Sequence, residues 1–146
     1  MVAPGPLDQL APMTATCPAS LRTAARSLRH TAVAMVGLGY RTPATGSRSW
    51  LYFPQPDIPF YRATNFSKYA PGNIPGADTG TYSTWMTETS LSLGQGRDRH
   101  ALVRSCDQAL RRHGLVPEQV LLASTHVEVI PYAHPVPTLG RAVAAS

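Results

Sequence analysis

Residues 49–69 read SWLYFPQPDIPFYRATNFSKY, and this stretch contains two short segments with the composition of β-strands. The first segment, WLYF, ends at Pro54, because proline cannot donate a backbone hydrogen bond to a neighbouring strand. The second segment, FYRATNF, follows the loop PQPDIP, and its alternation places Phe60 and Arg62 on one face and Tyr61 on the other. Two strands this close in sequence indicate a hairpin-like, antiparallel arrangement.

Outward from this stretch, hydrophobic periodicity predicts three more strands and two helices. Strands are expected in TAVAMVGLGY (31–40), in TYSTWMTETSLS (81–92) and around residues 120–130. Amphipathic helices are expected in PASLRTAARSLRH (18–30) and over residues 95–113. The second helix carries an apolar stripe of Leu102, Val103, Cys106, Ala109 and Leu110. We therefore expect an α+β fold with a mostly antiparallel sheet of about five strands and two amphipathic helices.

The length of 146 residues is that of one ordinary domain. The opening residues contain Pro4, Pro6 and Pro12, which disfavour long regular structure. We therefore predict a Pro-rich connection over residues 1–17, a single α+β substrate-binding region over 18–133, and a tail over 134–146 that leads to a missing C-terminal part.

Charge and cysteine content narrow the class of protein. The formal net charge is +5, which favours anionic partners, whereas only 14% of the residues are charged. Cys17 and Cys106 lack metal or CxxC spacing and are expected to be reduced thiols. No segment approaches a membrane span or a signal peptide, so we predict no membrane partner and a cytoplasmic location. The arginine-rich helical face is typical of a solvated surface, and nucleic acid is not favoured as a partner.

Familiar catalytic motifs do not fit the chain. The glycines of GLG at 37–39 follow a predicted strand, but Thr42 stands where a dinucleotide fingerprint needs its third glycine. His126 and Glu128 share a strand face without a third ligand nearby, so no metal site is expected. Neither a GxSxG motif nor a Cys–His pattern is present. We assign no catalytic residue.

The aromatic residues of 49–69 remain the candidate site. Arg62 lies among them, and its planar guanidinium can donate several hydrogen bonds to a phosphate. Tyrosine hydroxyls can donate to the same oxygens, and Trp50 offers a flat apolar wall. From the residue pattern alone, a structural aromatic cluster and an anion-binding pocket are equally well supported.

Four segments in this order resemble a known family of enzymes. WLYFP, PFYRATNFSKYAP, a strand ending in ETS, and PYAHPVPTLGR are similar to segments of the FAD-dependent amine oxidase and protoporphyrinogen oxidase superfamily. The closest likeness is to UDP-galactopyranose mutases, and it runs from about Pro6 to Arg141. In that family reduced FAD attacks the anomeric carbon of UDP-galactose, which then isomerises to the furanose, and NAD(P)H first reduces the flavin.

The resemblance implies a site for a nucleotide-sugar diphosphate in this chain. Arg62 would pair with the diphosphate, Tyr52 and Tyr69 would donate hydroxyls to it, and Trp50 would line the nucleotide pocket. His134 stands where the family has a tyrosine that also reaches the phosphates.

The family's FAD-binding Rossmann segment has no counterpart in this sequence. We therefore expect a middle, substrate-side part of a flavoenzyme, inactive without its missing flavin-binding half. Three alternatives stay open. They are a flavin amine or protoporphyrinogen oxidase in which Arg62 is structural, a small basic nucleic-acid-binding module, and a decayed gene fragment.

Overall fold

The computed structural model describes residues 5–92 and 98–138. One antiparallel sheet of five strands forms the body of the molecule, in the order β2-β3-β4-β1-β5. The strands are β1 (His30–Tyr40), β2 (Trp50–Tyr52), β3 (Arg62–Asn65), β4 (Ser83–Leu91) and β5 (Leu122–Pro135). The expected α+β class with a five-stranded antiparallel sheet is confirmed.

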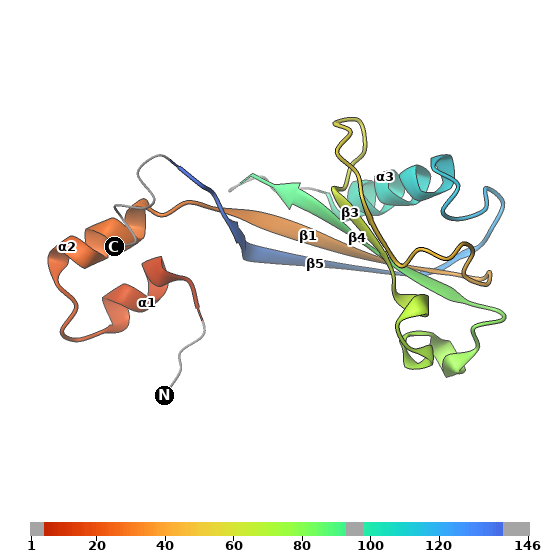
Figure 1. Cartoon of the computed structure of the whole chain (residues 1–146), viewed down its shortest axis with the longest axis horizontal. Helices are drawn as coiled ribbons and strands as arrows, with labels where there is room; N and C mark the ends of the chain where they lie inside the picture. The colour runs from red at the N-terminus through yellow and green to blue at the C-terminus, as the bar shows by residue number, and fades with distance from the viewer. Residues whose placement is uncertain (1–4, 93–97, 139–146) are drawn as a thin grey trace.

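The helix α3 (Arg99–Arg112) covers one face of this sheet (Figure 1). Its buried residues Leu102, Cys106 and Leu110 pack with Val36 and Leu38 of β1 in the main hydrophobic core. The apolar stripe that periodicity predicts is therefore the packed face. Asp98 caps the helix by accepting a hydrogen bond from the backbone of His100 at 2.9 Å. Residues 95–97 of the predicted helix lie outside the described residues.

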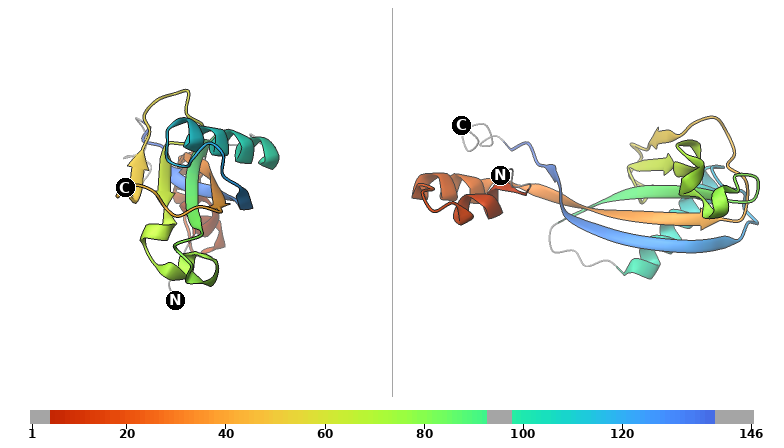
Figure 2. Two further views of the ribbon diagram at one scale, coloured as in Figure 1. Left: turned by 90° about the vertical axis from the view of Figure 1, so that its right-hand side faces the viewer. Right: turned by 90° about the horizontal axis from the view of Figure 1, so that it is seen from below.

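Two further helices, α1 (Leu7–Met13) and α2 (Ala19–Ser27), lie at the far end of β1 and β5, away from α3 (Figure 2). Helix α2 confirms the first predicted helix. Helix α1 was not predicted, because Pro12 argued against regular structure, yet the proline lies in its last turn. The connection between β3 and β4 contains three short 3₁₀ helices, η1 (Phe66–Lys68), η2 (Pro71–Asn73) and η3 (Pro75–Ala77).

Several expected boundaries differ from the structure by a few residues, and two of these differences affect the site. Strand β3 begins at Arg62 rather than at Phe60, because Pro59 and the preceding loop leave Phe60 packed in the core without strand pairing. Strand β5 continues to Pro135, past the expected end at residue 130 and past the predicted start of the tail at residue 134. A register shift opposite Thr31 and Val33 lets it continue beyond Pro131. The three-part division of the chain otherwise stays a prediction.

The described residues contain neither a membrane-spanning helix nor a metal-binding cluster. No helix in residues 5–92 and 98–138 is long and apolar enough to cross a membrane. Over the same residues, no group of three or more His, Cys, Asp or Glu side chains is placed to hold a metal ion.

Candidate functional site

The strand register brings the predicted site residues to the sheet face opposite α3. Tyr52 is paired with Arg62, Arg62 with Glu88, and Glu88 with Met35. Residues paired in this way project to the same side of a sheet, so these side chains form one row across four strands. The neighbours Leu51, Ala63 and Val36 alternate to the other side, where they join the core beneath α3.

Arg62 is held by the carboxylate of Glu88. Its Nε donates to Glu88 Oε1 at 2.7 Å, and its Nη2 donates to the same oxygen. The side chain of Arg62 is 25% exposed and that of Glu88 only 5%, so Glu88 is the buried member of this ion pair. Burial alone would lower the pKa of Arg62, but its hydrogen bonds with Glu88 and Tyr52 more than offset this, and the pKa is raised.

Tyr61 and His134 extend this group toward β5. Tyr61 donates its hydroxyl proton to Glu88 Oε2 at 2.6 Å, and the same hydroxyl lies 3.2 Å from His134 Nε2. Because the single proton of Tyr61 is directed at the carboxylate, Nε2 of His134 must be the donor in the second contact. Burial, and then the bond to Glu88, raise the pKa of Tyr61 to about 12.

Two aromatic side chains complete the group at the sheet edge. Arg62 Cζ lies 5.0 Å from the centre of the Trp50 ring and 5.9 Å from that of Tyr61, which gives the guanidinium an aromatic contact with each. The Trp50 and Tyr52 rings are stacked with centres 6.1 Å apart. Both are more than half exposed, so their surfaces can meet a ligand.

Four of the five predicted site residues are thus connected, and one stands apart. Trp50 and Tyr52 touch Arg62, and His134 reaches it through Tyr61 and Glu88. Tyr69 lies beyond η1, half exposed, with its ring packed edge-on against Phe66 at 5.4 Å between centres.

Sequence reasoning missed Glu88 and Tyr61 as members of the site. The expectation that Phe60 shares a face with Arg62 and that Tyr61 faces away is wrong: Phe60 packs in the core, and Tyr61 contacts Glu88 and Arg62, because strict alternation begins only at Arg62, where β3 starts. The available signal was Glu88 itself, the single acidic residue of a strand otherwise made of threonine, serine and apolar side chains.

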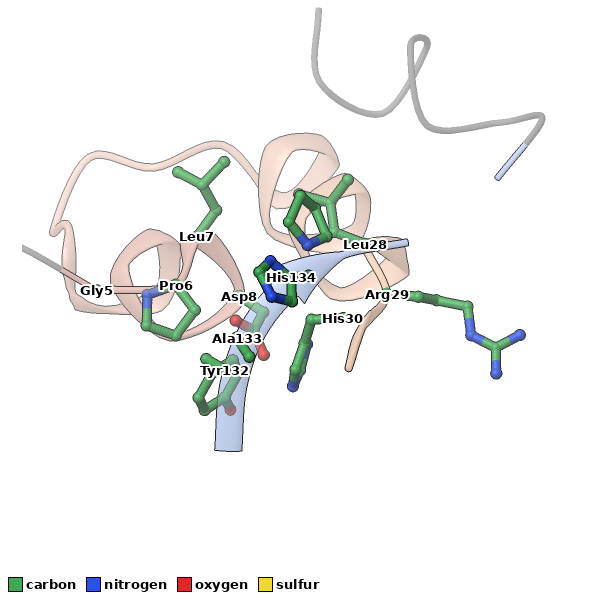
Figure 3. Close-up of a pocket in the computed structure, with 11 residues that line it drawn as sticks. Gly5, Pro6, Leu7, Asp8, Leu28, Arg29, His30, Tyr132, Ala133 and His134 are labelled. Atoms are coloured by element: carbon green, nitrogen blue, oxygen red, sulfur yellow. The ribbon is translucent and has the colours of Figure 1, made fainter. Parts of the chain in front are cut away.

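A groove of about 470 Å³ lies beside His134, between the helical end of the chain and β5 (Figure 3). His30 and Tyr132 stack in its wall with ring centres 4.1 Å apart. Gln9 of α1 donates to the Tyr132 hydroxyl at 2.7 Å, which ties the helical end to the strand. Asp8 and Arg29 also line the groove, so a charged group of each sign borders it.

The glycines of the GLG segment have a structural role. Both lie inside β1 rather than in a turn before a helix, and Gly39 faces β5 so closely that an added Cβ would lie 2.3 Å from Ser124 Oγ. Within residues 5–92 and 98–138, therefore, this segment does not form the pyrophosphate cradle that FAD requires.

Comparison with known proteins identifies the fold. No protein-family profile matches the chain. A crystal structure of reduced UDP-galactopyranose mutase matches 96% of the chain with a TM-score of 0.81 and 26% sequence identity. The chain has a UDP-galactopyranose-mutase-like fold and corresponds to 30% of the length of that structure.

Proposed function

We propose that this chain is the substrate side of a UDP-galactopyranose-mutase-like flavoenzyme and binds a nucleotide-sugar diphosphate. The observation that carries the proposal is Arg62, which is charged, oriented by Glu88 and stacked near Trp50 on the sheet face opposite α3. The similarity to the mutase structure over nearly the whole chain supports it.

Each residue would contribute a different contact. Arg62 would bind the diphosphate through its Nη atoms, because a planar guanidinium matches phosphate oxygens. The exposed Trp50 would stack on the base, and Tyr52 would donate its hydroxyl to a phosphate. Tyr69 and His134 would contact the ligand further from Arg62.

The pyrophosphate of a flavin would have to be bound outside the GLG segment. The GLG segment gives no pyrophosphate cradle, so we assign no FAD contact and no NAD(P)H contact to the described part of the chain. FAD, NAD(P)H and a flavin-binding half of the protein remain predictions of the resemblance. In such an enzyme the reduced flavin supplies the nucleophile, and this chain's residues bind and orient the substrate.

One observation favours a second candidate. Arg62 already has a buried counter-charge in Glu88, as a purely structural ion pair would. A related flavin enzyme that acts on an amine or a porphyrinogen would need Arg62 only in this structural role.

Titration of UDP against tryptophan fluorescence separates the two candidates. Trp50 is 52% exposed and Trp85 only 2%, so a ligand at Arg62 changes the emission of Trp50. We expect saturable binding of UDP, weakened about tenfold in Arg62→Lys because lysine cannot match the bidentate geometry. Uridine, which lacks phosphate, should bind equally to both proteins.

The matched control is Arg104→Lys, since Arg104 lies on α3 with 66% of its side chain exposed. Its affinity for UDP should equal that of the wild type. Absence of any response to UDP, or an equal loss of uridine and UDP binding in Arg62→Lys, would favour the structural role.

A further inference from the structure

We propose that Glu88 is a positioning residue that decides which edge of Arg62 can bind an anion. The proposal rests on the proposed function and adds a residue that the sequence pattern did not assign. Glu88 itself is almost completely buried and would not touch the ligand.

The carboxylate of Glu88 uses both of its oxygens. Oε1 accepts from Nε and Nη2 of Arg62, and Oε2 accepts from the Tyr61 hydroxyl. Because Glu88 lies on β4 inside the sheet and is anchored at both oxygens, it fixes the guanidinium in one plane and one rotation.

This hold leaves a defined part of Arg62 for a ligand. The edge formed by Nε and Nη2 faces Glu88, whereas Nη1 takes no part in the bonds to Glu88. The guanidinium is also hydrogen-bonded to Tyr52, whose exposed side chain would meet the ligand beside it. Trp50 lies against the face of the guanidinium. A diphosphate must therefore approach from the Nη1 side, next to the Trp50 ring, where a base and a phosphate of one nucleotide can be bound together.

Glu88 should also weaken anion binding through its charge. Its negative charge repels a phosphate and partly compensates Arg62, so removal of the charge alone should strengthen binding. Removal of the hydrogen bonds between Glu88 and Arg62 should weaken anion binding, because the freed arginine side chain must be ordered again by the ligand. The two roles thus predict opposite signs.

Two substitutions at one position distinguish these roles. Glu88→Gln keeps an oxygen that can accept from Arg62 and removes the charge, so UDP affinity should stay within about threefold of wild type or rise. Glu88→Leu removes both, and UDP affinity should fall about tenfold. If both variants bind UDP more tightly, Glu88 is only a counter-charge and the proposal is overturned.

Glu128→Leu is the matched control. Glu88 and Glu128 are paired with Met35 from opposite sides, but the Glu128 side chain is 63% exposed and borders His126 rather than Arg62. Loss of this charge should leave UDP affinity unchanged. A tenfold loss in this variant too would show that the effect belongs to the sheet and not to Arg62.

A second measurement needs neither UDP nor a stable Glu88→Leu protein. In the nitrogen-15 NMR spectrum of the whole chain, the Nε–H proton of Arg62 should be protected from exchange with water. It should stay protected in Glu88→Gln and on addition of UDP, which uses the other edge. Rapid exchange in the wild type would contradict the bond from Arg62 Nε to Glu88 and so overturn this inference. Protection of this proton without any binding of UDP would overturn only the proposed function.

Discussion

Because of Tyr61, the stability of the protein should decrease as the pH rises in the alkaline range. Its pKa is raised from 10.0 to about 12 by burial and by its bond to Glu88. Since the folded-state pKa is the higher one, the unfolded chain loses its proton first as the pH rises. The stabilisation is complete below pH 10 and is lost as the pH rises through about 12. Tyr40, which is buried and bonded to Asp107, acts in the same direction.

Urea unfolding at a series of pH values checks this expectation. The wild-type midpoint should fall between about pH 9 and about pH 12, and Tyr61→Phe should show a smaller fall because phenylalanine does not ionise. Tyr82→Phe is a control, since Tyr82 makes no side-chain hydrogen bond to Glu88 in the described residues. An unchanged pH profile in Tyr61→Phe would contradict the assigned bond.

Single residues show both the reach and the limit of sequence reasoning. The chemistry of its guanidinium marks Arg62 as a candidate anion-binding residue from the sequence alone. Which acid meets Arg62 depends on the pairing of β3 with β4, whose residues are 26 positions apart. A pairing register of this kind is set by packing of the whole sheet face rather than by either segment alone.

At the level of elements, Arg111 fastens the end of α3 to the chain that leads into β5. Its guanidinium donates to Asp107 at 2.9 Å and to the backbone oxygens of Pro117 and Val120 at 3.2 and 3.1 Å. It also lies 5.6 Å from the centre of the Tyr40 ring. One side chain thus joins a helix, a loop and strand β1.

Arg111→Ala should therefore lower the free energy of unfolding by about 1–3 kcal/mol, because the partly buried carboxylate of Asp107 and the backbone oxygens lose their donor. Arg112→Ala, at the next and exposed position, should change it by less than about 0.5 kcal/mol. Denaturant unfolding of the two variants gives both values. Equal stabilities would mean that the carbonyl contacts of Arg111 are replaced by water at no cost.

The elements themselves were well predicted where a periodic pattern was long. The stripe from Leu102 to Leu110 defines α3, and the run from residue 31 to 40 defines most of β1. The extra length of β5 was missed because Pro131 reads as a strand end, whereas a register shift accommodates it. Helix α1 was missed because only tertiary contacts, such as Gln9 with Tyr132, support so short a helix.

At the scale of the whole molecule, the helical end and the sheet body differ in local stability. In the described helices, α1 has no buried residue and α2 has only Ala25, whereas β1 and α3 share the main core. Amide protons of α1 and α2 should therefore exchange with solvent at least about tenfold faster than those of β1 and β4. Hydrogen-exchange mass spectrometry resolves these segments, and equal protection would show that the helical end unfolds together with the sheet.

The overall class could be predicted from the sequence, and the arrangement of the strands could not. Five strand-like segments with two helices between them are enough for an antiparallel α+β fold. The position of β1, the first strand in the sequence, between β4 and β5 depends on long-range pairing. Similarity to the mutase fold confirms this arrangement for nearly the whole chain.

Strand β5 is the outermost strand of the described sheet and runs from Leu122 to Pro135. One side of its backbone therefore offers hydrogen-bonding groups that no described strand satisfies, which is the arrangement through which proteins stick to one another. Pro131, the charged Glu128 and the local irregularity opposite Val33 each interrupt this template. Replacement of Pro131 and Glu128 by threonine or valine would therefore make this edge strand prone to aggregate during production of the protein.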